Sequence, residues 1–406
     1  MLSRRPSDER SPGAPRVDFP RLNAYLIILK FSIVQTDGYA RAGVIGTGRG
    51  EIATPVFMPV GTQGSVKAVE QRELGEIGAP VILGNAYHLY LRPGTALIEK
   101  AGGLHRFIGW PKPILTDSGG YQVFSLTGLR RIDEEGVRFK SHIDGSEHAF
   151  TPEGVIDIER SLGSDFMMVL DECAPFPCDE AYARESNEMT LRWAARCRER
   201  KERTAPKYGA DQFLFGIVQG GTYGAIRERS ARALAGMDFD GYAIGGLSVG
   251  EPEETMYGMT SVCTEILPAD RPRYLMGVGT PANMIEAIAR GVDMFDCVLP
   301  TRNGRNAVLF TRNGRLNMRN AAHAADFNPV DPSCTCYGCR NFTRAYLRHL
   351  FKAGEILALQ IASLHNLTFY TRLLAEARQA ILDRNFAPWK ESTLNTLSAG
   401  GADTYQ

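Results

Sequence analysis

Short apolar runs recur along the chain, and each ends in a small or polar residue before a stretch that is long enough for a helix. Continuous apolar runs of this length are typical of parallel strands that are buried on both faces. Eight alternations of strand and helix favour a closed (β/α)8 barrel, the TIM barrel, over an open sheet. The predicted strands are 55–60, 81–83, 113–116, 166–170, 213–218, 242–244, 274–276 and 292–298.

Two segments depart from this repeat. Residues 121–150 are polar and rich in turn-forming residues, which predicts a β-hairpin insertion between the third and fourth strands. The sequence Thr-Arg-Asn-Gly-Arg follows the eighth strand at 301–305 and occurs again at 311–315. Because Asn-Gly favours tight turns, we expect a ribbon here. A long amphipathic helix is expected at 355–385, and the tail from Ser392 is expected to fray.

Composition and charge narrow the class of protein. The 406 residues suit one large domain and an added module. With 46 basic and 46 acidic residues, the net charge does not indicate whether the protein binds nucleic acid. Any nucleic-acid binding surface must therefore be a local basic patch. No apolar run of membrane-spanning length occurs, and the polar first twenty residues lack a signal peptide. We therefore expect a cytoplasmic protein without membrane contact and with a disordered extension at 1–25.

Three cysteines have the spacing of metal ligands. Cys334, Cys336 and Cys339 form a Cys-x-Cys-x2-Cys knuckle, and His365 follows after 25 residues. Three thiolates and one imidazole would make a closed tetrahedral zinc site with no open position for water, so one structural Zn²⁺ per chain is expected. The alternative is three ordinary cysteines and an unrelated histidine. The predicted organisation is thus a barrel at 26–300, an arginine-rich, zinc-binding and helical segment at 301–390, and a tail at 391–406.

Three aspartates follow predicted strands. Asp117, Asp171 and Asp296 end the third, fourth and eighth strands, at the end of a barrel where active sites form. Because side chains alternate along a strand, an inward Asp296 turns Asp293 away from the barrel interior, where its charge would be costly. Each aspartate alone could instead cap the following helix. Because all three converge on one face of the barrel, a catalytic role is favoured over helix capping.

Glycines, an amide and arginines add to this picture. Gln219 precedes two glycines, and 245–247 reads Gly-Gly-Leu, which would let the backbone approach a flat ligand while Gln219 reads its edge. Either glycine pair alone is weak evidence for a binding site, because barrels need glycines in the turns after their strands. Five arginines follow with no acid before Asp326, and they suit phosphate contacts or, alternatively, a solvated face. They are Arg302, Arg305, Arg312, Arg315 and Arg319.

Several motifs together resemble one family. They are Asp-Ser-Gly-Gly-Tyr-Gln at 117–122, Leu-Asp-Glu-Cys at 170–173, Val-Gln-Gly-Gly at 218–221, Gly-Gly-Leu-Ser-Val-Gly-Glu at 245–251, Phe-Asp-Cys-Val-Leu-Pro-Thr-Arg at 295–302, and the cysteine and histidine set. From residue 30 or so to about 385, the chain resembles tRNA-guanine transglycosylase, the queuine tRNA-ribosyltransferase family. The resemblance implies a barrel with a zinc subdomain.

The resemblance also implies an activity and residue roles. The activity is exchange of guanine 34, the wobble base of target tRNAs, through a covalent enzyme–RNA intermediate in queuosine biosynthesis. Asp296 resembles the nucleophile and Asp117 the general acid/base. The residues that would bind the exchanged base are Asp171, Gln219, Gly246, Leu247 and Ser118. Those that would sandwich it are Tyr121 and Met276. Those that would hold the anticodon loop are Thr301, Arg302 and Arg305.

Two positions indicate which branch of the family the chain resembles. Cys173 and Val249 resemble the bacterial type, which takes prequeuosine-1 (7-aminomethyl-7-deazaguanine), whereas the eukaryotic queuine-inserting type resembles Val and Gly there. The resemblance further implies a homodimer and tRNAs with a GUN anticodon. The alternatives are the queuine-inserting type, a non-catalytic RNA-binding relative, and a glycosidase that acts on sugars or free nucleosides.

Overall fold

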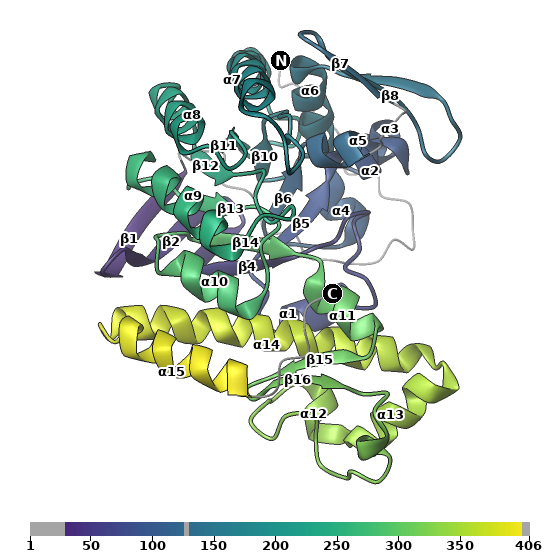
Figure 1. Ribbon diagram of the computed structural model, residues 1–406. Coiled ribbons are helices and arrows are strands. Elements are labelled where there is room, and N and C mark those ends of the chain that lie inside the picture. Colours follow the sequence, from purple (N-terminus) through teal and green to yellow (C-terminus); the bar gives the residue numbers. More distant parts are fainter. Residues whose placement is uncertain (1–28, 126–129, 400–406) are drawn as a thin grey trace, which may run out of the picture.

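The computed structural model describes residues 29–125 and 130–399, and within them eight parallel strands form a barrel (Figure 1). The sheet order is β4-β14-β13-β12-β11-β10-β6-β5, and a parallel bridge from Val60 to Leu83 joins its two edges. The predicted TIM barrel is confirmed. Its strands are β4 (Val56–Pro59), β5 (Ile82–Asn85), β6 (Ile114–Asp117), β10 (Phe166–Met168), β11 (Phe213–Val218), β12 (Gly241–Ile244), β13 (Arg273–Leu275) and β14 (Met294–Cys297).

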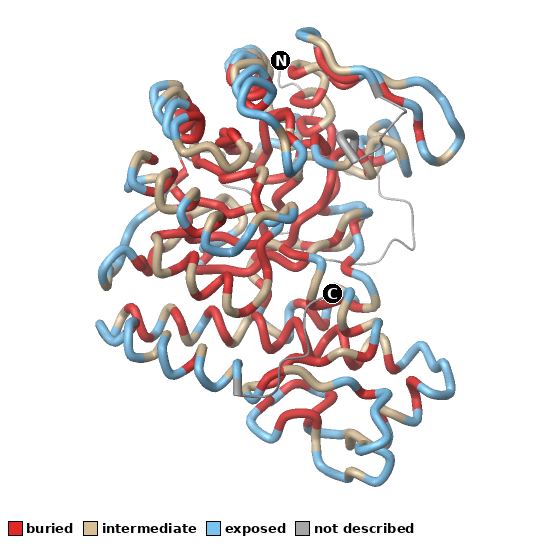
Figure 2. The backbone as a smooth tube through the Cα atoms, in the orientation of Figure 1, coloured by how far each residue is buried: buried red, intermediate tan, exposed pale blue. Residues whose placement is uncertain are grey.

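Helices follow the strands and cover the outside of the barrel. Figure 2 shows the strands as a buried interior, while α7 and α8 expose their outer faces. Because the strands are buried on both faces, their sequences do not alternate between apolar and polar residues. The helices are α1 (Gln71–Glu76), α2 (Ala86–Leu91), α3 (Thr95–Lys100), α4 (Leu104–Ile108), α5 (Gly120–Ser125), α6 (Pro152–Leu162), α7 (Glu180–Glu202), α8 (Gly224–Gly236), α9 (Glu253–Ile266) and α10 (Pro281–Ile288).

An antiparallel sheet that the sequence reasoning missed precedes the barrel. It consists of β1 (Lys30–Asp37), β2 (Ala40–Thr47) and β3 (Gly50–Thr54). Its Arg41 forms a buried ion pair with Asp293, which directly precedes β14. Asp293 is fully buried just before the start of β14, so its charge lies out of reach of water. Arg41 neutralises the charge that made burial look too costly.

The insertion between β6 and β10 contains the predicted hairpin together with a third strand. It is an antiparallel sheet of β7 (Arg130–Asp133), β8 (Gly136–Lys140) and β9 (Glu147–Phe150). Phe139 and Phe150 pack against Tyr87 of α2, so the insertion rests on the helix that follows β5. This arrangement places it beside the end of the barrel where the strands terminate.

The segment after β14 forms a second hydrophobic cluster on one side of the barrel. Its elements are α11 (Leu299–Arg305), β15 (Val308–Thr311), β16 (Gly314–Asn317), the 3-10 turn η1 (Ala321–His323), α12 (Tyr337–Asn341), α13 (Arg344–Ala353) and α14 (Ile356–Leu382). Figure 1 shows α14 running between the barrel on one side and β15, β16, α12 and α13 on the other. The first half of α14 contributes to the small cluster and its second half to the barrel core.

The repeated Thr-Arg-Asn-Gly-Arg sequence adopts two different structures. The copy at 311–315 makes the predicted ribbon turn between β15 and β16, where Gly314 has a φ of +93°. The copy at 301–305 is helical, so the ribbon prediction was wrong there. A Cβ at Gly304 would lie 2.9 Å from the backbone of α14. Glycine therefore serves a turn in one copy and close helix packing in the other.

Two terminal predictions have different outcomes. The predicted fraying from Ser392 was wrong for the described residues, because helix α15 (Phe386–Ala399) continues through Ser392 and packs beside α14, while residues 400–406 lie outside the described part. Phe386 is buried, and Lys390 pairs with Glu286 of α10 at 2.7 Å. The predicted extension at 1–25 lies outside the described residues. In the described part of the chain, every helix is too short or too polar to cross a lipid bilayer.

Candidate active site and metal centre

A cavity of about 430 Å³ opens at the carboxyl ends of the barrel strands. This volume is within the range of pockets that hold small molecules. Most of the predicted site residues border it, although they come from segments up to about 180 residues apart. The predicted residues on its wall are Asp117, Tyr121, Asp171, Gln219, Gly246, Leu247, Met276, Asp296 and Arg302.

The three predicted aspartates meet at this cavity. Asp117 ends β6, Asp171 lies three residues beyond β10, and Asp296 is in β14. Among the described residues, no lysine, arginine or histidine forms an ion pair with any of them. Carboxylates gathered without cations are costly to ionise, so their protonation states depend on their hydrogen bonds and on one another.

Asp117 is set up to carry a proton near neutral pH. Burial raises the pKa of Asp117 to about 7, and the negative charges of Asp171 and Asp296 add to this rise. Asn85, at the end of β5, donates an amide hydrogen to Oδ2 of Asp117 at 3.2 Å and another to Gln122 at 2.9 Å. A carboxyl group that titrates near neutral pH suits general acid/base chemistry.

Asp171 and Gln219 form a polar pair on the cavity wall. Gln219 Nε2 donates to Asp171 Oδ2 at 2.7 Å, and burial raises the pKa of Asp171 to about 6 against that opposing hydrogen bond. The buried Oε1 of Gln219 has no partner among the described residues. Gly246 has a φ of +63°, and a Cβ there would lie 2.3 Å from that oxygen. Only glycine leaves these groups open to a ligand edge.

Asp296 has a different environment from the other two acids. Tyr274 Oη donates to its Oδ1 at 2.6 Å, and the Gly277 N–H donates to the same oxygen at 2.7 Å. Burial raises the pKa of Asp296, while these two donors lower it. Both donors favour the charged form, and the pKa values of Asp117 and Asp171 are raised to about 7 and about 6, so Asp296 is the acid of the three best prepared to act as a carboxylate nucleophile.

The neighbouring thiol is less suited to that role. Cys297 also borders the cavity, but burial raises the pKa of its thiol to about 12. Its Sγ accepts the Leu299 N–H at 3.3 Å. A neutral thiol is a weak nucleophile, since the thiolate is the reactive form.

The other predicted base-binding residues occupy two kinds of position. Tyr121 and Met276 border the cavity, and Tyr121 is 55% exposed, so its ring is open to a stacking partner. Leu247 is buried in the cavity wall. Ser118 is fully buried, and its hydroxyl accepts the Gly120 N–H at 3.3 Å, which shapes the turn after Asp117. These roles in base binding stay predictions.

Three site residues escaped the sequence reasoning. They are Asn85, Tyr274 and Arg227. Arg227 is fully buried in α8 and donates to the carbonyl oxygens of Gly245 and Gly246, so it supports the loop that borders the cavity. Tyr274 could have been found by alternation, because it precedes Met276 by two residues and shares its face of the strand. No comparable signal marks Asn85 or Arg227.

The arginines after β14 differ in exposure and in their partners. Arg302 is exposed at the cavity mouth, whereas Arg305 is half-buried, and burial lowers its pKa. Thr301 is buried, and its hydroxyl donates to the Val298 carbonyl at 3.4 Å. Arg319 donates to the Asn306 carbonyl at 3.1 Å. Among the arginines after β14, Arg302 therefore has the clearest access to a ligand in the cavity.

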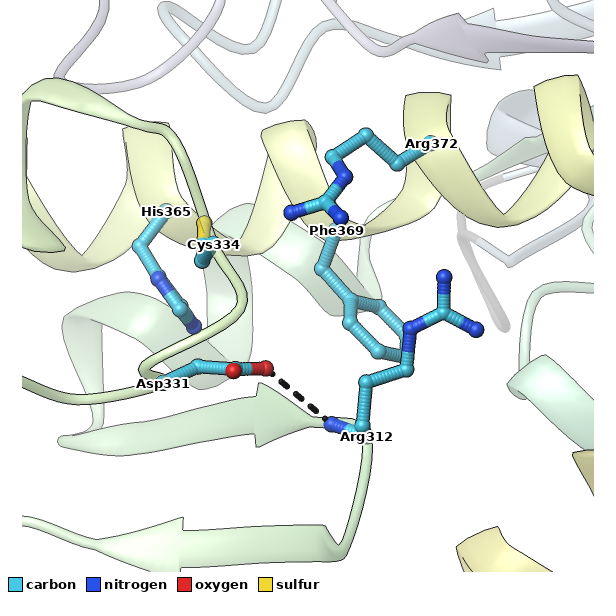
Figure 3. A pocket seen from close by; sticks show the side chains of 6 residues that line it. All are labelled: Arg312, Asp331, Cys334, His365, Phe369 and Arg372. Carbon is cyan, nitrogen blue, oxygen red and sulfur yellow. Dashed lines mark hydrogen bonds between the residues drawn. The ribbon is translucent and has the colours of Figure 1, made fainter.

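Arg312 takes part in the packing around α14. Figure 3 shows Arg312, Phe369 and Arg372 lining one pocket, with the backbone N–H of Arg312 donating to Asp331 at 3.2 Å. The Arg312 guanidinium pairs with Glu376, and burial together with the charge of Arg372 lowers its pKa. Its contact with phosphate stays a prediction.

The predicted metal ligands converge on one point. The ligand atoms of Cys334, Cys336, Cys339 and His365 lie within 4.8 Å of one another and are buried. His365 Nδ1 lies 3.6 Å from Cys336 Sγ and 3.3 Å from Cys339 Sγ, close to the roughly 3.5 Å that tetrahedral zinc bond lengths imply. His365 Nε2 donates to the Phe310 carbonyl at 2.7 Å, which leaves Nδ1 to bind a metal. The group fits one metal ion.

Comparisons with known proteins agree with this geometry. The family model described as Queuine tRNA-ribosyltransferase matches residues 36–399. A queuine tRNA-ribosyltransferase from Caldanaerobacter subterraneus subsp. tengcongensis is 56% identical over 368 residues, which cover 90% of this chain and 97% of that protein. One from Nitratidesulfovibrio vulgaris is 57% identical over 362 residues, which cover 89% and 96%.

Proposed function

The chain belongs to the queuine tRNA-ribosyltransferase family and is a tRNA-guanine transglycosylase of queuosine biosynthesis, and we propose that it exchanges guanine 34 of target tRNAs for prequeuosine-1. The observation that carries this proposal is the meeting of Asp117, Asp171 and Asp296 on one cavity without a cationic partner among the described residues. Carboxyl groups in such a place suit attack at a sugar carbon and proton transfer to a leaving base.

The proposed reaction divides the work between two aspartates. Asp296 attacks C1′ of the ribose and forms an ester, while the bond from C1′ to the base breaks. Asp117, whose pKa is about 7, gives the departing guanine its proton. The incoming base loses a proton to Asp117 and attacks C1′ from the vacated side, so configuration is retained. Asp171, Gln219 and the Gly246 backbone would hold the edge of either base.

This reading also accounts for the choice of acceptor. A hydrolase needs water at the covalent intermediate, whereas an exchanging enzyme must exclude water and hold a second base. The open Oε1 of Gln219 beside Asp171 offers both an acceptor and an ionisable partner to a flat heterocycle. The target base must leave the stack of the anticodon loop to reach it.

Incorporation of labelled base tests the proposal. Unmodified tRNA is incubated with radiolabelled guanine and the protein, and the label recovered in precipitated tRNA is counted. We expect incorporation into tRNA with a GUN anticodon, and loss of it when guanine 34 is replaced by adenine. No label in tRNA under any condition would exclude base exchange and would leave the non-catalytic RNA-binding alternative.

Two residues support the choice of incoming base. Cys173 and Val249 both border the cavity, and Val249, which stands where the queuine-inserting type resembles glycine, limits the space beside the base. We therefore expect prequeuosine-1 to compete with guanine and queuine to compete poorly. Equal inhibition by both bases would place the chain with the queuine-inserting type.

The metal and the oligomer need separate measurements. We propose that the buried cysteine and histidine group holds one Zn²⁺ per chain, which would tie the knuckle before α12 to α14 and leave no ligand position for catalysis. Elemental analysis should give one zinc per chain, and the absence of zinc would exclude this assignment.

We likewise propose that the protein is a homodimer. Sedimentation at micromolar concentration should then show twice the mass of the chain.

A further inference from the structure

The hydrogen bonds of Asp296 all fall on one of its two oxygens. Tyr274 and Gly277 both donate to Oδ1, and no described residue donates a hydrogen bond to Oδ2. Building on the proposed function, we propose that Tyr274 is a positioning residue, whose hydroxyl fixes the Asp296 carboxylate by Oδ1 and leaves Oδ2 free to attack C1′. Tyr274 would thereby also make the carboxylate a better leaving group in the second half of the exchange.

The fold holds this hydroxyl in a fixed place. Tyr274 lies in β13 and is directly paired with Met294 of β14, two residues before Asp296. Its side chain is only 1% exposed. Gly277, the second donor, lies two residues beyond the end of the same strand. One strand of the barrel therefore supplies both donors, and neighbouring β14 supplies the acceptor.

The hydroxyl is a donor and not a base. Burial raises the pKa of Tyr274 well above its ordinary value, and the negative charges of Asp296 and Asp117 raise it further. The phenol therefore keeps its proton throughout the working range of pH. A neutral donor beside a carboxylate favours the charged form of that carboxylate.

The two half-reactions use this bond differently. In the first, Oδ2 forms a bond to C1′ while the bond from C1′ to N9 of guanine breaks, and the base leaves with the electron pair and the proton of Asp117. In the second, N9 of the incoming base attacks C1′, its proton goes to Asp117, and the electron pair of the ester bond returns to Oδ2. Negative charge then grows on both carboxylate oxygens. The Tyr274 bond to Oδ1 strengthens at that moment and stabilises the transition state.

A matched pair of tyrosine variants separates this role from packing. Tyr274→Phe removes one oxygen atom. Tyr242→Phe does the same on adjacent β12, where the fully buried hydroxyl has no hydrogen-bond partner among the described residues. Each variant is assayed for guanine exchange from pH 4.5 to 9. The fraction of enzyme bound covalently to tRNA is measured on denaturing gels.

For Tyr274→Phe, we expect the acid limb of the kcat profile to move about one unit to higher pH, because the carboxylate loses a donor. We also expect kcat at pH 7 to fall about tenfold. The covalent fraction should rise, because the ester breaks down more slowly, while KM for tRNA stays unchanged. Tyr242→Phe should match the wild type in all of these.

An unchanged pH profile and covalent fraction in Tyr274→Phe would overturn the inference while leaving base exchange intact. Failure of the wild type and of Tyr242→Phe to exchange guanine would overturn the proposed function, and the inference with it. If Tyr274→Phe does not fold, 3-fluorotyrosine at position 274 keeps the ring and strengthens the donor. The acid limb should then move to lower pH, and an unmoved limb would contradict the role.

Discussion

Aspartates lie at both ends of the barrel, buried beside cations at one end and lining a cavity at the other, and the consequences are opposite. At the amino ends of the strands, Asp293 pairs with Arg41, and Asp165 contacts Arg49 at 3.2 Å and His105 at 2.9 Å. At the carboxyl ends, the aspartates of the cavity have no cationic partner among the described residues. They are Asp117, Asp171 and Asp296.

This difference separates stability from chemistry. A buried carboxylate with an arginine and backbone donors is satisfied, and removing either partner leaves a costly charge. A buried carboxylate without a cation has a raised pKa and can exchange a proton or attack an electrophile near neutral pH. In barrels of this kind, reactive groups collect at the carboxyl ends and structural ones at the amino ends. Two aspartates three residues apart, Asp293 and Asp296, fall on the two sides of this division.

The largest effect is expected from Asp296→Asn. Guanine exchange should fall by at least about 10³-fold, because the amide cannot form the ester. The free energy of unfolding should change by less than about 1 kcal/mol, since the amide oxygen can still accept from Tyr274 and Gly277. Exchange at the wild-type rate would exclude Asp296 as the nucleophile. Initial rates and urea unfolding of the same preparation provide the two measurements.

Asp293→Asn should lower stability and leave the exchange activity intact, the reverse of Asp296→Asn. The change leaves Arg41, which is 3% exposed, without its counter-charge. The free energy of unfolding should fall by about 3–5 kcal/mol. Exchange per folded molecule should stay near the wild-type value, as measured at a temperature where the variant remains folded. A selective loss of exchange without a loss of stability would remove the distinction between the two ends.

Asp117→Asn tests the comparison through the pH dependence of stability. The pKa of Asp117 is about 7 in the folded protein against 3.8 for a free carboxyl, so the folded state binds more protons between these values. Stability from this group is present below about pH 4 and is lost as pH rises to about 7. Relative to wild type, the variant should therefore gain about 1–2 kcal/mol at pH 8 and nothing at pH 4, after allowance for solvent in the cavity. Equal effects at both pH values in thermal unfolding would contradict the raised pKa.

The smallest effect is expected at the cavity rim. Arg302→Ala should raise KM for tRNA several-fold and reduce the slope of log KM against log salt by about 0.7–0.9, as for one lost phosphate contact. The control is Arg72→Ala, another exposed arginine, which lies in α1 and pairs with Glu70 and Glu76. Equal salt slopes for both variants and the wild type would exclude Arg302 from binding RNA.

Much of this architecture could be predicted from the sequence. All eight barrel strands were predicted because strands buried on both faces read as continuous apolar runs. The metal ligands were predicted because thiolate chemistry and spacing are local features. The aspartates at the strand ends follow from alternation and from the geometry of a closed barrel.

The rest depends on contacts between distant segments. Arg41 and Asp293 are 252 residues apart, so no local pattern marks their pairing or the sheet β1–β3 that carries Arg41. The two copies of Thr-Arg-Asn-Gly-Arg have the same sequence but different structures, and the close approach of Gly304 to the backbone of α14 is a contact that the local sequence does not reveal. Asn85 and Arg227 act through a few side-chain hydrogen bonds to residues that are not their neighbours in the sequence, and residues of their type occur at many positions that have no such role.

The most direct test of the central claim is to locate the covalent bond to RNA. The protein is incubated with tRNA in the absence of free base, denatured and digested, and the peptide that carries the ribose-linked nucleotide is sequenced by mass spectrometry. We predict attachment at Asp296, and none in Asp296→Asn. Attachment at Asp117, Asp293 or Cys297, or no adduct from wild-type protein that exchanges guanine, would contradict the assignment of the unpaired carboxylate in β14 as the nucleophile.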